Sequence, residues 1–364
     1  MNSVIKAVLA QFKQHGYEAY VIGGFVRDYV LGIHSDDIDI ATNATPQQVK
    51  EIFDHTIDVG IAHGSITVMI DHQSFDITTF RSDGSYSNHR RPDHVVYGDS
   101  LEMDVLRRDF TMNAIAMNMD EEIIDIVGGK MDLNHQLIKA IGDPYIRMQE
   151  DALRIIRALR FVSVLGFDLD DALLEAMKQH QQLVDLIAME RIQIEIRKLL
   201  QGPHLDKMNH YLRSLAISLI PPQFENNPKL SLVEQLVIAE QRFPSFESRF
   251  LLTKQEQKQF VYLREVPPHR PDSYQIYVSP YPQSMIHVGS ILFGWDPQTL
   301  INQYDQLIIH KRDELAITGR DIEALGFKGP AIEAMLIQIE KAVLEHQIQN
   351  NNEEIVDYAK ENSA

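Results

Sequence analysis

The chain has 364 residues, a formal net charge of −18 and 44% hydrophobic residues, a composition typical of a globular protein long enough for more than one domain. Because it contains no cysteine, disulfide bonds, thiolate metal ligands and a cysteine nucleophile are excluded. No apolar run is long enough to cross a membrane, and residues 1–9 lack a secretory signal, so we expect a cytoplasmic protein with no membrane partner. The acidic balance disfavours unspecific coating of nucleic acid, but a local basic surface could still bind RNA.

The first chemical feature along the chain is a glycine pair at residues 23–24, which follows an amphipathic helix within residues 1–20 and a short buried strand. We expect a helix over residues 26–31 to follow it. Backbone N–H groups can approach a phosphate at such a glycine turn, and Arg27 lies one helical turn beyond Gly24 as a counter-charge. A glycine pair alone is more often only a turn.

Two carboxylates come next, because Asp37 and Asp39 alternate with Ile38 and Ile40 along a predicted strand. Residues two apart on a strand point to the same face, so the two carboxylates project together. They repel each other and titrate abnormally unless a divalent cation neutralises them. Mg²⁺ prefers oxygen ligands and completes its shell with water and substrate phosphates. The glycine turn and the carboxylate pair together predict a site for a metal-bound nucleotide, although an Asp-x-Asp sequence alone is usually a solvated strand edge.

Asp76 lies in the second of two further strands, which are predicted over residues 59–70 and 74–80. It is a candidate third carboxylate beside the first two, and the alternative is an edge-strand aspartate with no role in the site. Residues 81–101 then turn polar and show no sustained period, which predicts a long loop. Long loops in compact domains tend to be functional.

The order and spacing of these motifs carry a resemblance to known proteins. Gly-Gly-x-x-Arg-Asp at residues 23–28, followed by Asp-x-Asp at residues 37–39, resembles the signature of nucleotidyltransferases related to DNA polymerase β. Residues 107–116, which read Arg-Arg-Asp-Phe-Thr-Met-Asn-Ala-Ile-Ala, resemble the second signature of the tRNA nucleotidyltransferases, the CCA-adding enzymes, in their bacterial and eukaryotic class. The resemblance implies that three residues of this segment contact the ribose and the triphosphate: Arg108, Asp109 and Asn113. From the residues alone, the segment predicts a charge cluster at a helix start.

A helix is predicted to begin at residues 143–144, Asp-Pro, and to continue through residue 161. Its buried side is expected to comprise Ile155, Ile156, Leu159 and Val162. Arg154 and Arg157 lie near the middle of the opposite side. Asp151 and Arg160 lie at the two edges of that side. Without a resemblance, this pattern predicts a solvated face with ion pairs worth about a few tenths of a kcal/mol each.

Glu-Asp-x-x-Arg at residues 150–154 resembles the base-recognition motif of the same family, which implies that Asp151 and Arg154 select the nucleotide. A carboxylate accepts from the amino group that cytosine and adenine share, and an arginine donates to their ring acceptors. Uracil and guanine carry an oxygen in place of that amino group, which would leave the carboxylate repelled and unpaired. Because Asp151 and Arg160 lie about half a turn apart around the helix, we assign Arg157 and Arg160 to phosphate, to orienting Asp151, or to the RNA end.

The strand pattern ends after residues 125–129, and we predict helices and loops from about residue 143 onward. Residues 190–197 resemble the family's next helical motif, which we interpret as a structural brace. We therefore predict an α+β fold: an N-terminal polymerase β-like nucleotidyltransferase head, built from a small mixed sheet with helices, followed by an all-helical neck, body and tail. The predicted boundaries are 1–140 for the head, 141–200 for the neck, 201–300 for the body and 301–364 for the tail, which is expected to contact tRNA.

The resemblance implies template-independent addition of C, C and A to the 3′ end of tRNA from CTP and ATP, with Mg²⁺ held by Asp37 and Asp39 and pyrophosphate released. Asp76 would complete the metal site or accept a proton. The alternatives are addition of only CC or only A, which the presence of residues 81–101 disfavours, and a bacterial poly(A) polymerase, which the acidic C-terminus disfavours. A non-catalytic RNA-binding protein is a further alternative. The sequence leaves the oligomeric state open, a homodimer included.

Overall fold

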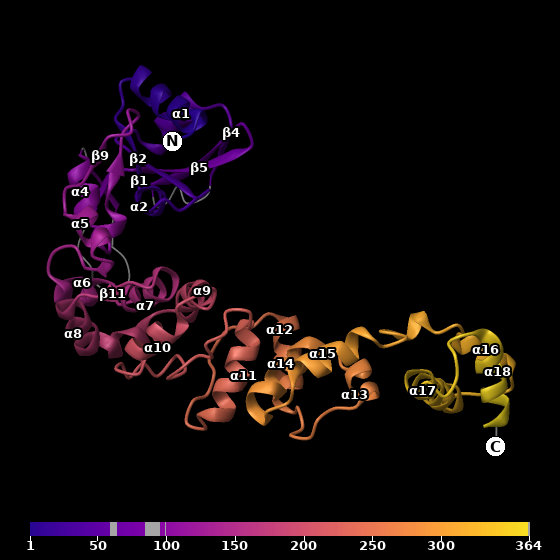
Figure 1. The fold of residues 1–364 in the computed structure, drawn as a ribbon. Helices are drawn as coiled ribbons and strands as arrows, with labels where there is room; N and C mark the ends of the chain where they lie inside the picture. Colours follow the sequence, from indigo (N-terminus) through magenta and orange to yellow (C-terminus); the bar gives the residue numbers. More distant parts are fainter. Residues whose placement is uncertain (59–63, 84–94, 99, 363–364) are drawn as a thin grey trace. The chain divides into compact units, whose positions relative to one another are not determined.

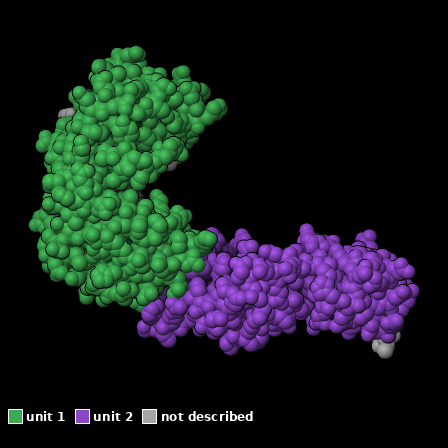
Figure 2. Space-filling model, viewed as in Figure 1, with its two compact units in different colours: residues 1–229, 248–251 green, residues 230–247, 252–364 purple. Residues whose placement is uncertain are grey.

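Figure 1 shows the computed structural model, which describes residues 1–58, 64–83, 95–98 and 100–362. The chain divides into two compact units (Figure 2). The first unit comprises residues 1–229 and 248–251, and the second comprises residues 230–247 and 252–364. The finer division into head, neck, body and tail stays a prediction.

A mixed sheet lies at the centre of the N-terminal region, in the strand order β3-β4-β5-β2-β1-β8-β9 (Figure 1). Its strands are β1 Ala19–Ile22, β2 Ile38–Thr42, β3 Thr56–Ile57, β4 Ser65–Ile70, β5 Gln73–Thr79, β8 Ala116–Met117 and β9 Ile123–Ile124. β2 pairs in parallel with β5, and the other neighbours are antiparallel. Alternation along β2 buries Ile38 and Ile40 on one face and puts Asp39 on the other. The predicted small mixed sheet is confirmed.

Helices pack around this sheet: α1 Ser3–Gln14, α2 Gly24–Leu31, α3 Pro46–Ile52, α4 Leu101–Leu106, α5 Gly129–Asn134 and the 3₁₀ turn Thr111–Asn113. Their starts follow from local chemistry. The Asn2 side chain accepts from the Ile5 amide at 2.9 Å and caps α1. Thr45 and Gln48 form a capping box before α3, whose first residue is a proline.

Residues 81–101 are not a continuous loop, contrary to the prediction. β6 Arg81–Asp83 and β7 Val95–Tyr97 form an antiparallel pair, and α4 begins at Leu101. The loop predicted for residues 84–94 and the strand start predicted for residues 59–63 lie outside the described residues. The predicted helix start at Arg107 is wrong, because Arg107 is the C-cap of α4. That helix begins after Ser100, whose side chain accepts from the Met103 amide.

The single helix predicted from residue 144 through residue 161 is also wrong, because it is two helices: α6 Pro144–Glu150 and α7 Leu153–Leu165. Between them, Asp151 is extended, with φ −143° and ψ 99°. Its carboxylate accepts from the Leu153 amide at 3.1 Å, so the side chain competes with continued helical hydrogen bonding. The predicted buried side of α7 is confirmed, since Ile155, Ile156, Leu159 and Val162 are all buried.

The rest of the first unit is mainly helical. Its further elements are β10 Leu137–Ile138, β11 Asp168–Leu169, α8 Asp171–His180, the 3₁₀ helix Gln181–Leu186, α9 Met189–Leu199 and α10 Leu205–Leu212. β10 and β11 form a short parallel pair. The two-residue strand β11 therefore interrupts the neck, residues 141–200, which we predicted to be all-helical. α7 and α9 pack against each other, which places α9 beside the helix that follows the Asp151 break.

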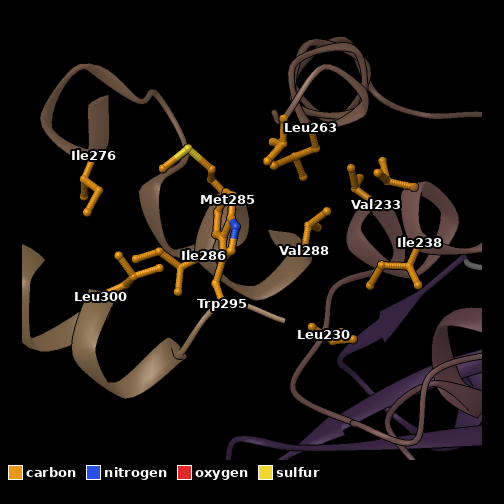
Figure 3. Close-up of a cluster of buried hydrophobic side chains, with 12 residues drawn as sticks. Leu230, Val233, Ile238, Leu263, Ile276, Met285, Ile286, Val288, Trp295 and Leu300 are labelled. Atoms are coloured by element: carbon orange, nitrogen blue, oxygen red, sulfur yellow. The ribbon is translucent and has the colours of Figure 1, made fainter. Parts of the chain in front are cut away.

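The second unit is helical, and its elements are α11 Leu232–Arg242, α12 Lys254–Arg264, α13 Ser273–Val278, α14 Pro282–Phe293, α15 Pro297–Asp305, the 3₁₀ turn Arg312–Glu314, α16 Gly319–Ala324, α17 Pro330–Leu344 and α18 Asn352–Glu361. One of its cores surrounds Trp295 (Figure 3). The indole N–H of Trp295 donates to the Pro268 carbonyl at 3.1 Å, which satisfies the ring's one polar atom. Within the described ranges, no helix is both long enough and apolar enough to span a bilayer.

Candidate active site

A cavity of about 590 Å³ in the first unit collects most of the predicted site residues. It is lined by Gly23, Gly24, Arg27, Asp37, Asp39, Arg108, Asp109, Asn113, Arg157, Arg160, Phe161, Val164, Lys198, Gln201, Gly202 and Pro203. These residues come from the glycine turn, β2, the segment after α4, α7 and the end of α9. The volume is in the range of small-molecule binding sites.

The carboxylates lie at the sheet. Asp39 faces Asp76 across the parallel pairing of β2 with β5, and Asp37 comes directly before β2. Burial raises the pKa of Asp39 to about 6, the charges of Asp37 and Asp76 add to this, and Arg108 opposes it. Asp76 is exposed and accepts from the Thr67 hydroxyl at 2.6 Å.

This carboxylate set fits a hard divalent cation that keeps part of its shell for water and phosphate. The pKa of Asp39 is raised because burial and the neighbouring carboxylates disfavour its ionised form more than Arg108 favours it. Among the described residues, no group of three or more potential metal ligands is assembled. The described residues therefore offer a metal at most a pair of carboxylates here, which leaves its other positions to water and substrate.

The glycine turn is held close to charged groups. Gly23 has a φ of +84°, and a Cβ atom on it would lie 3.4 Å from Arg108 Nη1 and 3.4 Å from Asp39 Oδ2. The backbone conformation favours glycine there, because side chains of L residues are strained at this φ. Gly24 is the first residue of α2, and Arg27 one turn later is buried, with its Nη1 donating to Asn113 Oδ1 at 2.9 Å. The predicted counter-charge thus lies on the cavity wall.

A chain of charged contacts joins the second signature to the helices. Asp109 Oδ2 accepts from Arg157 Nε at 2.7 Å, and Arg157 Nη1 lies 3.2 Å from Glu195 Oε1. Arg160 Nη1 lies 3.0 Å from Glu195 Oε2. Burial alone would raise the pKa of Asp109, but Arg157 and hydrogen bonds from Phe110 and Asn113 hold it at about 2. Asp109 therefore acts as a permanent anion that orients Arg157.

The ring of Phe161 contacts three arginines at the same wall of the cavity. The guanidinium carbons of Arg160, Arg27 and Arg157 lie 4.2, 5.4 and 5.7 Å from the centre of its ring. Such contacts are favourable because the ring face is electronegative. The aromatic ring thus helps to keep three positive charges together at a cavity whose wall contains three carboxylates, those of Asp37, Asp39 and Asp109.

Asp151 and Arg154 are not among the residues that line the cavity. Arg154 is buried, and its Nη1 donates to the Arg147 carbonyl at 2.6 Å and to Glu150 at 3.1 Å. Asp151 pairs with Arg191 of α9 at 2.8 Å. The predicted exposed position of Arg154 is therefore wrong, because the break after α6 turns this side chain back onto α6.

Sequence reasoning missed several residues of the wall, among them Phe161, Lys198 and Gln201. Lys198 is exposed, lines the cavity, and its charge lowers the pKa of Asp39 against the larger effect of burial. The signal that could have found it is Glu195, a charged residue inside the otherwise apolar stripe Ile192, Ile196 and Leu199. A buried charge on a helix indicates that this side of the helix faces charged groups. Lys198 follows Glu195 by one turn and therefore lies near the same side.

Three family models match the chain. A poly A polymerase head domain matches residues 19–139, a probable RNA and SrmB-binding site of polymerase A matches residues 166–219, and a putative tRNA nucleotidyltransferase domain 2 matches residues 290–359. The CCA-adding enzyme of Anoxybacillus flavithermus is 37% identical, over 97% of this chain and 95% of the relative. That of Staphylococcus aureus is 34% identical, over 96% of each.

Solved structures agree with these matches. The Bacillus stearothermophilus CCA-adding enzyme in complex with CTP superposes with a TM-score of 0.85 and 32% identity, over 100% of this chain and 98% of that one. The Thermotoga maritima CCA-adding enzyme complexed with tRNA superposes with a TM-score of 0.69, over 100% and 97% of the two chains. At 17% identity, the second likeness concerns the fold alone.

Proposed function

This chain belongs to the family of CCA-adding enzymes, and from that premise we propose that it adds C, C and A to the 3′ end of tRNA. The donors are CTP and ATP, no template is used, and pyrophosphate is the second product. The observation that carries the proposal is one cavity in which Asp37 and Asp39 lie with the glycine turn and Arg108. The relative in complex with CTP and the match to a putative tRNA nucleotidyltransferase domain support the choice of substrates.

The glycine turn, Arg27 and Arg108 bind the triphosphate. The turn exposes backbone N–H groups at the start of α2, and Arg27 and Arg108 supply positive charge beside it. Asn113 and Asp109 keep Arg27 and Arg157 in place by hydrogen bonds. Because these groups are held by each other before substrate arrives, little reorganisation is needed on binding.

Asp37 and Asp39 would hold the divalent metal on which this kind of transfer depends, and we propose Mg²⁺ because the donors are carboxylates. When bound, such a metal lowers the pKa of the attacking ribose hydroxyl and neutralises charge on the triphosphate. Asp76 lies across the strand pairing from Asp39. Its place supports a role either as a further ligand or as the acceptor of the hydroxyl proton.

Base selection is proposed for Asp151 and Arg154. Each has a protein partner in this structure, Arg191 for the carboxylate and Glu150 for the guanidinium. To bind cytosine or adenine, both side chains must exchange these partners for the base. Arg157 and Arg160 already face the cavity, and we assign them to nucleotide phosphate or the RNA end. We place the protein in the cytoplasm, where tRNA and nucleoside triphosphates are found.

The test is incubation of the purified protein and MgCl₂ with tRNA that lacks its CCA end. CTP alone should extend it by two nucleotides, and a third should appear only when ATP is added, with UTP and GTP unused. An Asp37→Asn variant should lose extension while it still binds tRNA, which separates an enzyme from a non-catalytic RNA-binding protein.

Other products would change the assignment. Extension that stops at two nucleotides, or that begins only on tRNA ending in CC, would indicate a partial activity. A long run of A would indicate a poly(A) polymerase. Activity that survives EDTA, with no loss in Asp37→Asn, would contradict the proposed metal site.

A further inference from the structure

Asp104 is a buried carboxylate of α4 that is not among the residues of the cavity wall. It is 0% exposed. Each of its oxygens serves one arginine: Oδ1 accepts from Arg107 Nε at 2.8 Å, and Oδ2 accepts from Arg108 Nε at 3.1 Å and Arg108 Nη2 at 3.0 Å. A buried carboxylate that binds two guanidinium groups is costly to keep for stability alone.

The contact with Arg108 uses one edge of its guanidinium group. Nε and Nη2 both donate to the single oxygen Oδ2 of Asp104, and two hydrogen bonds from one edge restrict rotation of the group. Nη1 is the remaining corner, and it lies 3.4 Å from the position that a Cβ atom on Gly23 would occupy. Asp39 Oδ2 lies at the same distance from that position, so Nη1 is directed at the space between the glycine turn and Asp39.

The backbone under this arginine is held as well. Arg147 of α6 donates through Nη2 to the carbonyl of Arg108 at 2.7 Å and also to the carbonyl of Arg107. Although burial alone would raise the pKa of Asp104, the charges of Arg108 and Arg107 lower it below its usual value. Asp104 is therefore ionised at neutral pH, and Arg108 is fixed at both its main chain and its side chain.

We propose that Asp104 is a positioning residue for the incoming nucleotide, which holds Arg108 so that its Nη1 contacts the triphosphate beside Asp39. The inference rests on the proposed function for the identity of the nucleotide. Arg107 provides the matched comparison, since it shares the same carboxylate but is not part of the cavity wall. Loss of either contact should weaken the local fold, whereas only the Arg108 contact should affect nucleotide binding.

The experiment measures CTP affinity by calorimetry with MgCl₂ and without tRNA. Asp104→Asn should weaken CTP binding by about tenfold, the size expected for a lost contact with a charged group. Arg107→Met should change it by less than about threefold, although both variants should lower the melting temperature. In an Arg108→Met background, Asp104→Asn should cause no further loss beyond about twofold. In turnover, the KM for CTP and ATP should rise and that for tRNA should not.

Several outcomes would overturn the proposal. Equal losses of CTP affinity in Asp104→Asn and Arg107→Met would assign Asp104 to the fold only, and a full further loss in the Arg108→Met background would show that it does not act through Arg108. If Asp104→Asn does not fold, Asp104→Glu keeps the charge, displaces the carboxylate, and should show the same selective loss. A wild-type protein that shows the coupling but does not extend tRNA would refute the proposed function and leave this inference intact.

Discussion

The two units bury different kinds of side chains. In the first unit, buried charged residues meet at or behind the cavity, among them Arg27, Asp104 and Glu195. In the second unit, Glu234 and Glu340 are buried but serve local contacts, with His287 and with Arg312. Its interior also includes the apolar packing around Trp295 (Figure 3) and a second apolar cluster that contains Ile339. Because buried charge rarely stabilises a fold, its concentration at this cavity agrees with the active site that we propose there.

The largest expected effect is that of Asp39→Asn, which should reduce nucleotide transfer on the order of 10²- to 10³-fold, as for other losses of preorganised charge. The same substitution should increase the free energy of unfolding at neutral pH. Folding raises the pKa of Asp39 from 3.8 to about 6, so the folded protein binds more protons between these values and loses stability as the pH rises through them. The variant should be more stable above pH 6 by up to about 3 kcal/mol.

This gain should disappear below about pH 4, where the carboxyl is protonated in both states. Urea unfolding in EDTA at pH 4, 6 and 8 measures it, and Asp76→Asn is the control because Asp76 is exposed and bonded to Thr67. MgCl₂ should stabilise the wild-type protein but not the variant, since a ligand stabilises only the state that binds it. A variant that is less stable at pH 8 would contradict the described electrostatics.

Glu195→Gln should have the next largest effect, because it removes the buried partner of both Arg157 and Arg160. We expect a loss of about 3 kcal/mol in the free energy of unfolding, together with weaker CTP binding. Glu175→Gln, which removes an exposed partner of Lys178, should cost less than about 1 kcal/mol. Equal losses of unfolding free energy in the two variants would mean that the buried contacts of Glu195 contribute no more to stability than an exposed ion pair does.

Gly289→Ala should disturb the apolar interior of the second unit. A Cβ atom there would lie 2.1 Å from the Trp295 ring, so the indole or α14 must move. The expected cost is about 1–3 kcal/mol, without a change in CTP affinity. Gly319→Ala is the matched control, because its nearest neighbour would lie at 3.7 Å. Loss of CTP binding in Gly289→Ala would contradict the separation of chemistry from this core.

Lys198→Met should have the smallest effect. We expect its exposed ammonium group to contact a phosphate of the tRNA end. The slope of log affinity for tRNA against log salt should then fall by about 0.7 to 1, while the KM for CTP stays unchanged. Lys178→Met, outside the cavity, should leave the slope unchanged. A rise in the KM for CTP instead would reassign Lys198 to the triphosphate.

The parts of the site that the sequence predicts well are those that depend on local geometry. Alternation at the start of β2 is enough to place Asp39 beside Asp37, the residue directly before the strand, and both line the cavity. A glycine turn before a helix is likewise visible in a few residues. The second signature was found in the same way, by its own residues. Each of these motifs is short, so its geometry does not depend on distant parts of the chain.

The missed features depend on contacts between distant segments. Arg157 meets Asp109 and Glu195 across 48 and 38 residues, and no periodicity indicates such pairs. The break at Asp151 was missed because the helical period continues through it, while a side-chain hydrogen bond ends the first helix. With that break, Arg154 of α7 contacts Glu150 of α6, whereas Arg157 and Arg160 line the cavity.

The cavity wall runs from Gly23 to Pro203, whereas the head domain recognised by its family model ends at residue 139. The segment that the family model matches is therefore shorter than the segment that forms the cavity wall. A fragment cut at residue 139 would keep the carboxylates but lose every arginine of α7 and the lysine of α9. For protein engineering, this makes the sheet an incomplete module: a transplantable catalyst must carry the helices through Pro203 with it.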